Sequence, residues 1–369
     1  MPSVGVKIYS VFFKLWLRHR LQSLAAADPD PAAAAFGVSC RPDEATAPAN
    51  PAFSAADGVA SKDLHIDPKS SLSVRIFLPT PPPTVPAHLL LHPHPRRASD
   101  PTPTPASNGG APYRGYLPHA VSSSPRAPAS ARRRLPIVVQ LHSGGFATGS
   151  SSAAANDAFC RRVTKLCDAI VVAVGYRLAP ESRYPAAFED GVKVLKWIAK
   201  QANLALMSKV GGGVDTFGAS TVEPWIAAHG DPARCVLLGA SCGANIADYV
   251  TRKVVEDSKL FDPIKKEFNL DHPAANPLAP GRGGPPLKCM PPTLTVIAEH
   301  DWMRDRAIAY SEELRKVNVD SPVLDYKDTV HEFATLDVFL KTPQAQACAE
   351  DIAIWMKKYI SLRGHEFSY

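Results

Sequence analysis

The pattern of hydrophobic and polar positions is most regular from residue 135 onward. Short apolar runs, such as LPIVVQL (135–141) and AIVVAVGY (169–176), alternate there with longer stretches of helical periodicity. Continuous apolar runs of this length are typical of strands that are buried on both faces of a parallel sheet. The alternation therefore predicts an α/β fold, in which helices cover both faces of a mostly parallel sheet.

Further elements follow from the same reading of the chain. A strand pair is predicted at 59–66 and 72–79, on either side of the turn signal Asp67-Pro68. Later strands are predicted at 234–241, 293–301 and 322–328, helices at 153–167, 185–202, 244–255, 305–317 and 344–360, and a Gly-rich loop at 205–220. The main domain should thus comprise residues 59–78 and 135–369.

Residues 1–27 are predicted to form an amphipathic helix. Its polar stripe is Ser3, Lys7, Ser10, Lys14, Arg18 and Gln22, and apolar side chains fill the other positions. We expect the side with Phe12, Phe13 and Trp16 to be buried on the domain. Because the stripe is basic and free of acids, contact with a membrane surface is the alternative.

Residues 79–134 are dense in Pro, Ser and His and are predicted to be a disordered insertion between two strands. Arg114, Arg126 and the run 132–134 supply much of the formal net charge of +6, and no acid lies among them. A solvated loop explains this cluster, so no nucleic-acid partner is expected.

The seven cysteines are odd in number and include no C-x-x-C pair. A disulfide framework and a zinc site are therefore not expected. The cysteine usage instead fits a protein of a reducing compartment. No secretory signal is visible, and the uncharged run Ile8–Phe13 is too short to cross a bilayer. We expect a cytoplasmic protein.

The stretch GASCG (239–243) carries the first chemical signal. It places Ser241 between two glycines, after an apolar strand and before a helix. Gly-x-Ser-x-Gly in this context is a nucleophile elbow, whose tight turn exposes the hydroxyl at the carboxyl end of the sheet. Its glycines are needed because neighbouring backbone passes too close for side chains. Ser241 is the candidate nucleophile.

A serine hydroxyl needs a base, which in turn needs an orienting acid. Asp301 ends one predicted strand, and His331 follows the next. The order Ser, Asp, His, with each residue just past a strand, is the order of the triad on such sheets. We expect His331 to act as the base and Asp301 to orient it.

The stretch HSGGF (142–146) directly follows a buried strand. Backbone N–H groups of Gly144 and Gly145, with that of Cys242, could form an oxyanion hole for a tetrahedral intermediate. His142 is expected to brace this loop.

Together these stretches resemble the plant carboxylesterases of the hormone-sensitive-lipase-like branch of the α/β-hydrolase family. The resemblance rests on HSGGF, VAVGYRLAPESRYPAAFEDG, GASCGAN, TLTVIAEHDWMRDRA and YKDTVHEF. It implies an α/β-hydrolase fold, an amino-terminal helix that acts as a lid, and the triad and oxyanion hole named above.

The sequence departs from the family at three places. Ser143 replaces the first glycine of a His-Gly-Gly-Gly loop, and Ala240 and Cys242 replace Asp and Ala of the elbow. Cys242 is expected to contribute only its backbone N–H. Residues 256–292 contain nothing that resembles a buried strand, so one sheet strand and part of the cap are expected to be absent.

The leading hypothesis is a serine esterase that hydrolyses small carboxylic esters. One alternative is a non-catalytic binder of a hormone-like small molecule, as in the related gibberellin receptors, although those do not keep the triad histidine. Another is an inactive, shortened variant. The sequence contains no metal-ligand cluster, phosphate loop or dinucleotide fingerprint, so no cofactor or metal is expected, and the oligomeric state stays open.

Overall fold

A computed structural model describes residues 4–26, 35–80, 134–209, 222–257, 276–279 and 285–365. Residues 81–133 of the predicted insertion therefore lie outside the described residues. Most of the predicted Gly-rich loop also lies outside them.

The main sheet has five strands in the order β1-β2-β4-β3-β5. Strands β1 (Val59–His65) and β2 (Ser73–Pro79) form an antiparallel pair, and β2 is antiparallel to β4 (Ile170–Gly175). Strand β3 (Leu135–Leu141) lies between β4 and β5 (Gly230–Gly239) and is parallel to both. All five strands were predicted from the sequence.

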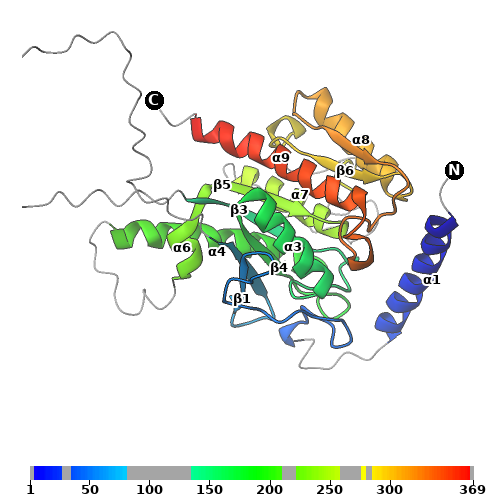
Figure 1. The fold of residues 1–369 in the computed structure, drawn as a ribbon, viewed down its shortest axis with the longest axis horizontal. Coiled ribbons are helices and arrows are strands. Elements are labelled where there is room, and N and C mark those ends of the chain that lie inside the picture. The colour runs from blue at the N-terminus through cyan, green and yellow to red at the C-terminus, as the bar shows by residue number, and fades with distance from the viewer. Residues whose placement is uncertain are drawn as a thin grey trace, which may run out of the picture. The chain divides into compact units, whose positions relative to one another are not determined.

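Helices cover both faces of this sheet (Figure 1). One face packs against α4 (Ala186–Lys209), α6 (Pro224–His229) and α7 (Cys242–Asp257). The other face packs against α3 (Ala154–Cys167) and α9 (Pro343–His365). Helix α4 extends beyond its predicted end and takes in the first residues of the predicted loop.

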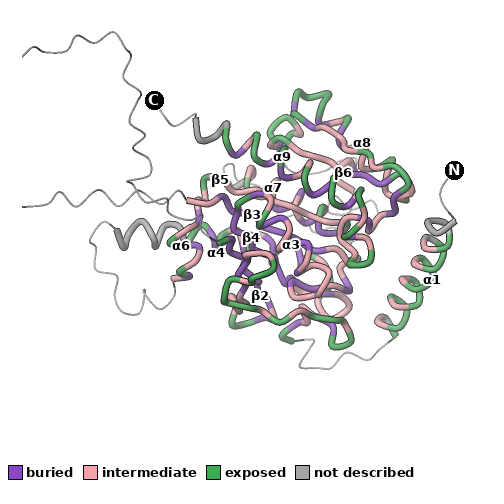
Figure 2. Tube along the Cα trace, in the orientation of Figure 1, coloured by how far each residue is buried: buried purple, intermediate pink, exposed green. Residues whose placement is uncertain are grey.

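Successive side chains of each strand point to opposite faces of the sheet, because the strands are pleated. Ile137 and Val139 of β3 join a core that includes Phe188 of α4, while Val138 joins one that includes Met356 of α9. Every residue of β4 is buried, as the purple trace in Figure 2 illustrates. The continuous apolar runs in the sequence reflect this burial on both faces.

Strands β6 (Thr295–Ala298) and β7 (Val323–Tyr326) form a separate, parallel two-stranded sheet, which α8 (Arg304–Lys316) accompanies. In the described part of the chain, β5 and β6 do not pair, and no strand lies between them in sequence. The stretch 256–292, in which no strand was predicted, is described only in part.

Strand β5 is less buried than β3 and β4. None of residues 231–239 is fully buried, whereas the residues of β3 from Pro136 onward all are. A strand in the middle of a sheet covered by helices on both faces would be buried like β3 and β4. Within the described residues, β5 is therefore an edge strand.

Helix packing joins the two sheets. Ile352 of α9 packs against the core beneath α3 and also against the core of β6 and β7. A hydrogen bond of 2.7 Å from Tyr310 Oη of α8 to Asp248 Oδ1 of α7 forms a second link. These contacts fix the position of β6 relative to β5 without strand pairing.

Helix α1 (Val4–Ala26) forms where a helix was predicted, but its burial differs from the prediction. Phe13 is half-buried, whereas Phe12 is 72% exposed and Trp16 48% exposed. The predicted burial of Phe12 is wrong, and that of Trp16 is at most partial. Successive residues are 100° apart around a helix, so Phe12 and Phe13 cannot share the center of one contact face. No described helix is both long enough and apolar enough to cross a membrane.

Candidate active site

Ser241 lies on a tight turn between β5 and α7 and has a left-handed backbone, with φ of 53°. This conformation is strained for a residue with a Cβ and is common at functional sites. A Cβ on Gly239 would collide with the backbone of Gly243 and Ala244, and one on Gly243 would collide with the carbonyl of Leu141. Both glycines are therefore required by close backbone approach, as predicted.

The other two candidate residues lie beside this serine. His331 Nε2 is 2.8 Å from Ser241 Oγ, and His331 Nδ1 is 2.7 Å from Asp301 Oδ2. The Asp301 carboxylate also accepts a hydrogen bond of 2.7 Å from the Met303 N–H. The structure thus brings the three candidates together, with the imidazole of His331 between the hydroxyl of Ser241 and the carboxylate of Asp301.

Two opposing effects act on the imidazole of His331. Burial lowers its pKa, but the hydrogen bond and charge of Asp301, with the charge of Glu332, outweigh burial and raise the pKa above its usual 6.5. Glu332 is itself half-buried, and burial raises the pKa of its carboxyl group. The site therefore favours a protonated imidazole more than water does.

The loop after β3 has three consecutive residues with positive φ, which are Gly144 (125°), Gly145 (61°) and Phe146 (66°). A Cβ on Gly144 would collide with the carbonyl of Thr148, so glycine is required there. Ser143 has no positive φ and needs no conformation that its Cβ disfavours. The loop accommodates this departure from the family pattern.

His142 is buried behind the loop, with its ring stacked on Tyr176 at a centroid distance of 4.0 Å. Burial lowers its pKa to about 4, so the ring is neutral near pH 7. Its Nδ1 lies 2.8 Å from the carbonyl oxygen of Ser143, which makes Nδ1 the protonated, donating nitrogen. This contact agrees with a bracing role.

The side chain of Cys242 has contacts that the sequence did not suggest. Its sulfur accepts a hydrogen bond from the Phe146 N–H at 3.4 Å and lies 3.6 Å from Tyr176 Oη. Burial raises the pKa of the thiol, which therefore stays protonated near neutral pH. The thiol links the elbow directly to the glycine loop.

A residue from the segment before β1 also holds the glycine loop. The carboxylate oxygens of Glu44 accept the Gly149 N–H at 2.9 and 3.0 Å. Nearby, Arg41 pairs with Glu181 at 2.7 Å and donates to the carbonyl of Ala147. Sequence reasoning missed both residues, because their partners lie more than 100 positions away and no local pattern marks them.

Aromatic side chains connect α1 to the triad. The ring of Trp302 lies 4.7 Å from that of His331, and Phe13 stacks on Trp302 at 6.2 Å. Tyr9 Oη donates to Glu332 Oε2 at 3.3 Å. Helix α1 therefore contacts the residues that flank the catalytic candidates.

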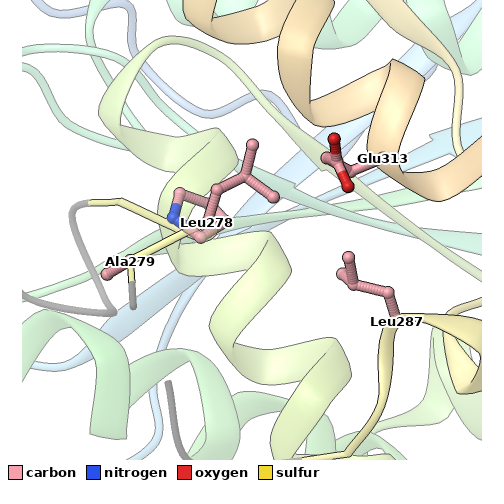
Figure 3. A pocket seen from close by; sticks show the side chains of 5 residues that line it. Leu278, Ala279, Leu287 and Glu313 are labelled. Carbon is pink, nitrogen blue, oxygen red and sulfur yellow. The ribbon is translucent and has the colours of Figure 1, made fainter. Parts of the chain in front are cut away.

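A cavity of about 390 Å³ lies elsewhere, among residues of α8, of the 3-10 turn at 287–289 and of the short described stretch 276–279 (Figure 3). It is lined by Pro277, Leu278, Ala279, Leu287 and Glu313. None of these residues belongs to the triad or to the glycine loop, so the cavity has no assigned part in the chemistry.

A family model described as the alpha/beta hydrolase fold matches residues 138–265 and 259–335. The chain belongs to the α/β-hydrolase family. Two proteins of Arabidopsis thaliana named probable carboxylesterases are 54% and 50% identical, and each alignment covers both chains completely. This α/β hydrolase is thus placed in the plant carboxylesterase branch, as the sequence motifs indicated.

More distant relatives share parts of this α/β hydrolase. A gibberellin receptor of Arabidopsis thaliana is 31% identical over 52% of this chain and 60% of the receptor. An esterase from the archaeon Pyrobaculum calidifontis has the same fold, with a TM-score of 0.52 and 21% identity over 81% of this chain and 83% of the esterase.

The family model matches this hydrolase in two segments rather than one, and the break between them falls after the elbow helix and before the acid-bearing strand. The 54% identical alignment has 456 positions against 369 residues in this chain, a difference of 87. The two segments matched by the family model meet at residues 259–265. That junction lies within 256–292, where the sequence predicted a missing strand.

Proposed function

We propose that this carboxylic ester hydrolase cleaves small carboxylic esters through an acyl-enzyme, with Ser241 as the nucleophile. The observation that carries the proposal is the continuous contact from Ser241 Oγ to His331 Nε2 (2.8 Å) and from His331 Nδ1 to Asp301 Oδ2 (2.7 Å). Nucleophile, base and orienting acid are the three parts that serine hydrolysis requires.

In the first half of the reaction, Ser241 Oγ attacks the ester carbonyl carbon and His331 Nε2 takes the hydroxyl proton. The carbonyl oxygen becomes an oxyanion, which accepts hydrogen bonds from the N–H groups of Gly144, Gly145 and Cys242. The carboxylates of Asp301 and Glu332 stabilise the imidazolium, because their negative charges favour the protonated ring. His331 then protonates the departing alkoxide, and the alcohol leaves.

In the second half, a water molecule attacks the acyl group on Ser241 while His331 Nε2 takes a proton from that water. The tetrahedral intermediate uses the same oxyanion N–H groups. His331 returns its proton to Ser241 Oγ as the acid product forms. No net charge or proton accumulates on the protein over the cycle.

The aromatic residues beside His331 favour an ester with an apolar group. Trp302 is 47% exposed, although its ring lies against His331. Phe13 covers part of that ring, which supports a lid role for α1. We infer that the exposed part of Trp302 forms one wall of the substrate site.

Two other functions stand as alternatives. A hormone-like binder is suggested by the gibberellin receptor relatives. Ligand binding alone does not require a histidine 2.8 Å from an elbow serine, and this contact favours hydrolysis. An inactive shortened variant is suggested by the split sheet, but the short triad distances favour an active chain.

The test is turnover of short p-nitrophenyl esters by the purified full chain. Ser241→Ala should lower kcat by roughly 10⁴-fold or more, and Asp301→Asn by about 10⁴-fold. The control is Ser361→Ala, at an exposed position of α9, which should keep full activity. An organophosphate should label Ser241.

Label on another residue, or full activity of Ser241→Ala, would exclude Ser241 as the nucleophile. A cooperatively folded parent chain that turns over no ester would favour the binder or the inactive variant. Saturable binding of a small molecule in the absence of turnover would then separate these two.

A further inference from the structure

Helix α1 carries a second apolar face in addition to the one that contacts the domain. We call it the outer face of α1 and define it as Ile8, Val11, Phe12 and Leu15. Their exposed fractions lie between 61% and 72%, and α1 is accordingly drawn mainly in the exposed and intermediate colours in Figure 2.

The outer face points away from the residues that hold α1 to the rest of the protein. Those contacts are made by Tyr9, Phe13 and Arg20, which lie within about 40° of one another around the helix axis. At 100° per residue, the outer face is centred more than 120° away from them. It can therefore meet a second surface without disturbing the first.

The charges on α1 have one sign. Residues 4–26 contain no Asp or Glu, and exposed Lys14 and Arg18 border the outer face. Arg20 is paired with Asp43 on the domain side, so it does not contribute to this border. Both cations lie along one edge of the apolar ridge, and cations beside an apolar, acid-free face favour a helix that lies in the interface of an anionic bilayer.

Exposed large apolar residues elsewhere do not form such a row. On the other described helices they include Val254 on α7 and Ile354 on α9, which are isolated along their sequences. Isolated exposed apolar residues are ordinary, whereas a contiguous group marks an interaction site. An apolar protein surface carries no anions to pair with Lys14 and Arg18, whereas an anionic lipid surface does. The cationic border therefore favours a lipid surface over an apolar protein.

We propose that the outer face of α1 binds an anionic lipid surface, with Ile8, Val11, Phe12 and Leu15 entering the headgroup region and Lys14 and Arg18 pairing with lipid anions. The inner face of α1 meanwhile keeps Phe13 on Trp302, beside His331. Binding therefore brings the mouth of the candidate active site close to the lipid.

The proposal is tested by sedimentation of the full chain with vesicles of phosphatidylcholine, with or without phosphatidylserine. The parent chain should bind only the vesicles that contain phosphatidylserine, and salt should weaken binding. The double variant Phe12→Asp/Leu15→Asp should lose at least about tenfold in partitioning, because two apolar contacts are removed and two anions added.

A matched control distinguishes the loss of the outer face of α1 from the change in net charge. Val254→Asp/Ile354→Asp makes the same charge change at exposed apolar positions of α7 and α9 and should retain more of the vesicle binding. Lys14→Glu/Arg18→Glu should abolish the preference for anionic lipid. Thermal melting of each variant confirms that it is folded.

Three results would overturn the proposal. The first is a parent chain that sediments with neither vesicle, and the second is a Phe12→Asp/Leu15→Asp variant that binds as well as the parent. The third is a parent chain that does not bind vesicles and forms a dimer that this variant abolishes. That last result would assign the outer face to a second copy of the chain.

Discussion

Ser241 and His331 are in contact at 2.8 Å although they follow strands of two different sheets. Ser241 follows β5 of the five-stranded sheet, and His331 follows β7 of the two-stranded sheet. No strand pairing joins these sheets within the described residues. The contact therefore depends on helix packing, through Ile352 of α9 and the Tyr310–Asp248 hydrogen bond.

This arrangement shows whether the gap left by the predicted missing strand closes or stays open. Closing the gap would move Asp301 and His331 by about one strand spacing, roughly 4.8 Å, relative to Ser241. The distance of 2.8 Å between His331 Nε2 and Ser241 Oγ excludes such a displacement. The gap between β5 and β6 instead stays unpaired in the described residues, and β5 is half-buried as a result.

A strand added beside β5 should stabilise the chain. We predict that grafting a buried strand and a crossover between residues 259 and 265 raises Tm by at least about 2 °C, because the edge of β5 gains a partner. Circular dichroism melting measures the change. A Gly/Ser insertion of equal length is the control and should not raise Tm. An equal Tm for the parent and the graft would show that the unpaired edge of β5 does not lower the stability of the chain.

The acid limb of the pH profile should report His331. The imidazole must be neutral to accept the Ser241 proton, so kcat/KM should rise with pH through its pKa, which lies above 6.5. Glu332→Gln removes one negative charge and should move this limb to lower pH. Tyr9→Phe removes a hydrogen bond that lowers the pKa of Glu332, so the carboxyl group carries less charge and the limb should shift in the same direction by a smaller amount.

The exposed residue Glu350 on α9 supplies the control for this experiment. Glu350→Gln makes the same chemical change and should leave the pH profile where it is. An unchanged limb in Glu332→Gln would mean that the charge of Glu332 does not reach the imidazole.

The sulfur of Cys242 should position the glycine loop. Cys242→Ala removes the acceptor of the Phe146 N–H and should lower kcat about fivefold, with little change in KM. Cys242→Ser should recover part of the loss, because a hydroxyl also accepts hydrogen bonds. Steady-state kinetics on a p-nitrophenyl ester measure both effects. If Cys242→Ala matches the parent in kcat and KM, Cys242 contributes only its backbone N–H and its thiol does not position the loop.

The contact between Phe13 and Trp302 should affect substrate choice. Phe13→Ala uncovers one side of the Trp302 ring and should change the ratio of kcat/KM values for short and long acyl chains. Phe53→Ala removes a similarly sized, 45% exposed side chain in the segment before β1 and is the control. The same ratio in parent and Phe13→Ala would separate α1 from the substrate site.

The strands could be predicted from the sequence, and so could the three residues that the structure brings together as a candidate triad, because both have local signals. Apolar runs marked β3 and β4, and the glycines around Ser241 marked the turn. The partners of Cys242 Sγ and Glu44 could not be predicted, since they are 96 and 105 positions away. The exposure of Phe12 was missed because α1 has apolar residues on two faces, and periodicity does not tell which face meets the domain.

Helix α9 follows all three triad residues in the chain, and it is also one of the elements that hold the two sheets together. During synthesis, the nascent chain therefore contains Ser241, Asp301 and His331 well before the helix that fixes their separation has left the ribosome. Because α9 also covers one face of the five-stranded sheet, neither that face nor the spacing of Ser241 from His331 is complete until α9 has docked. A chain that stops before α9 should therefore leave the candidate triad unassembled.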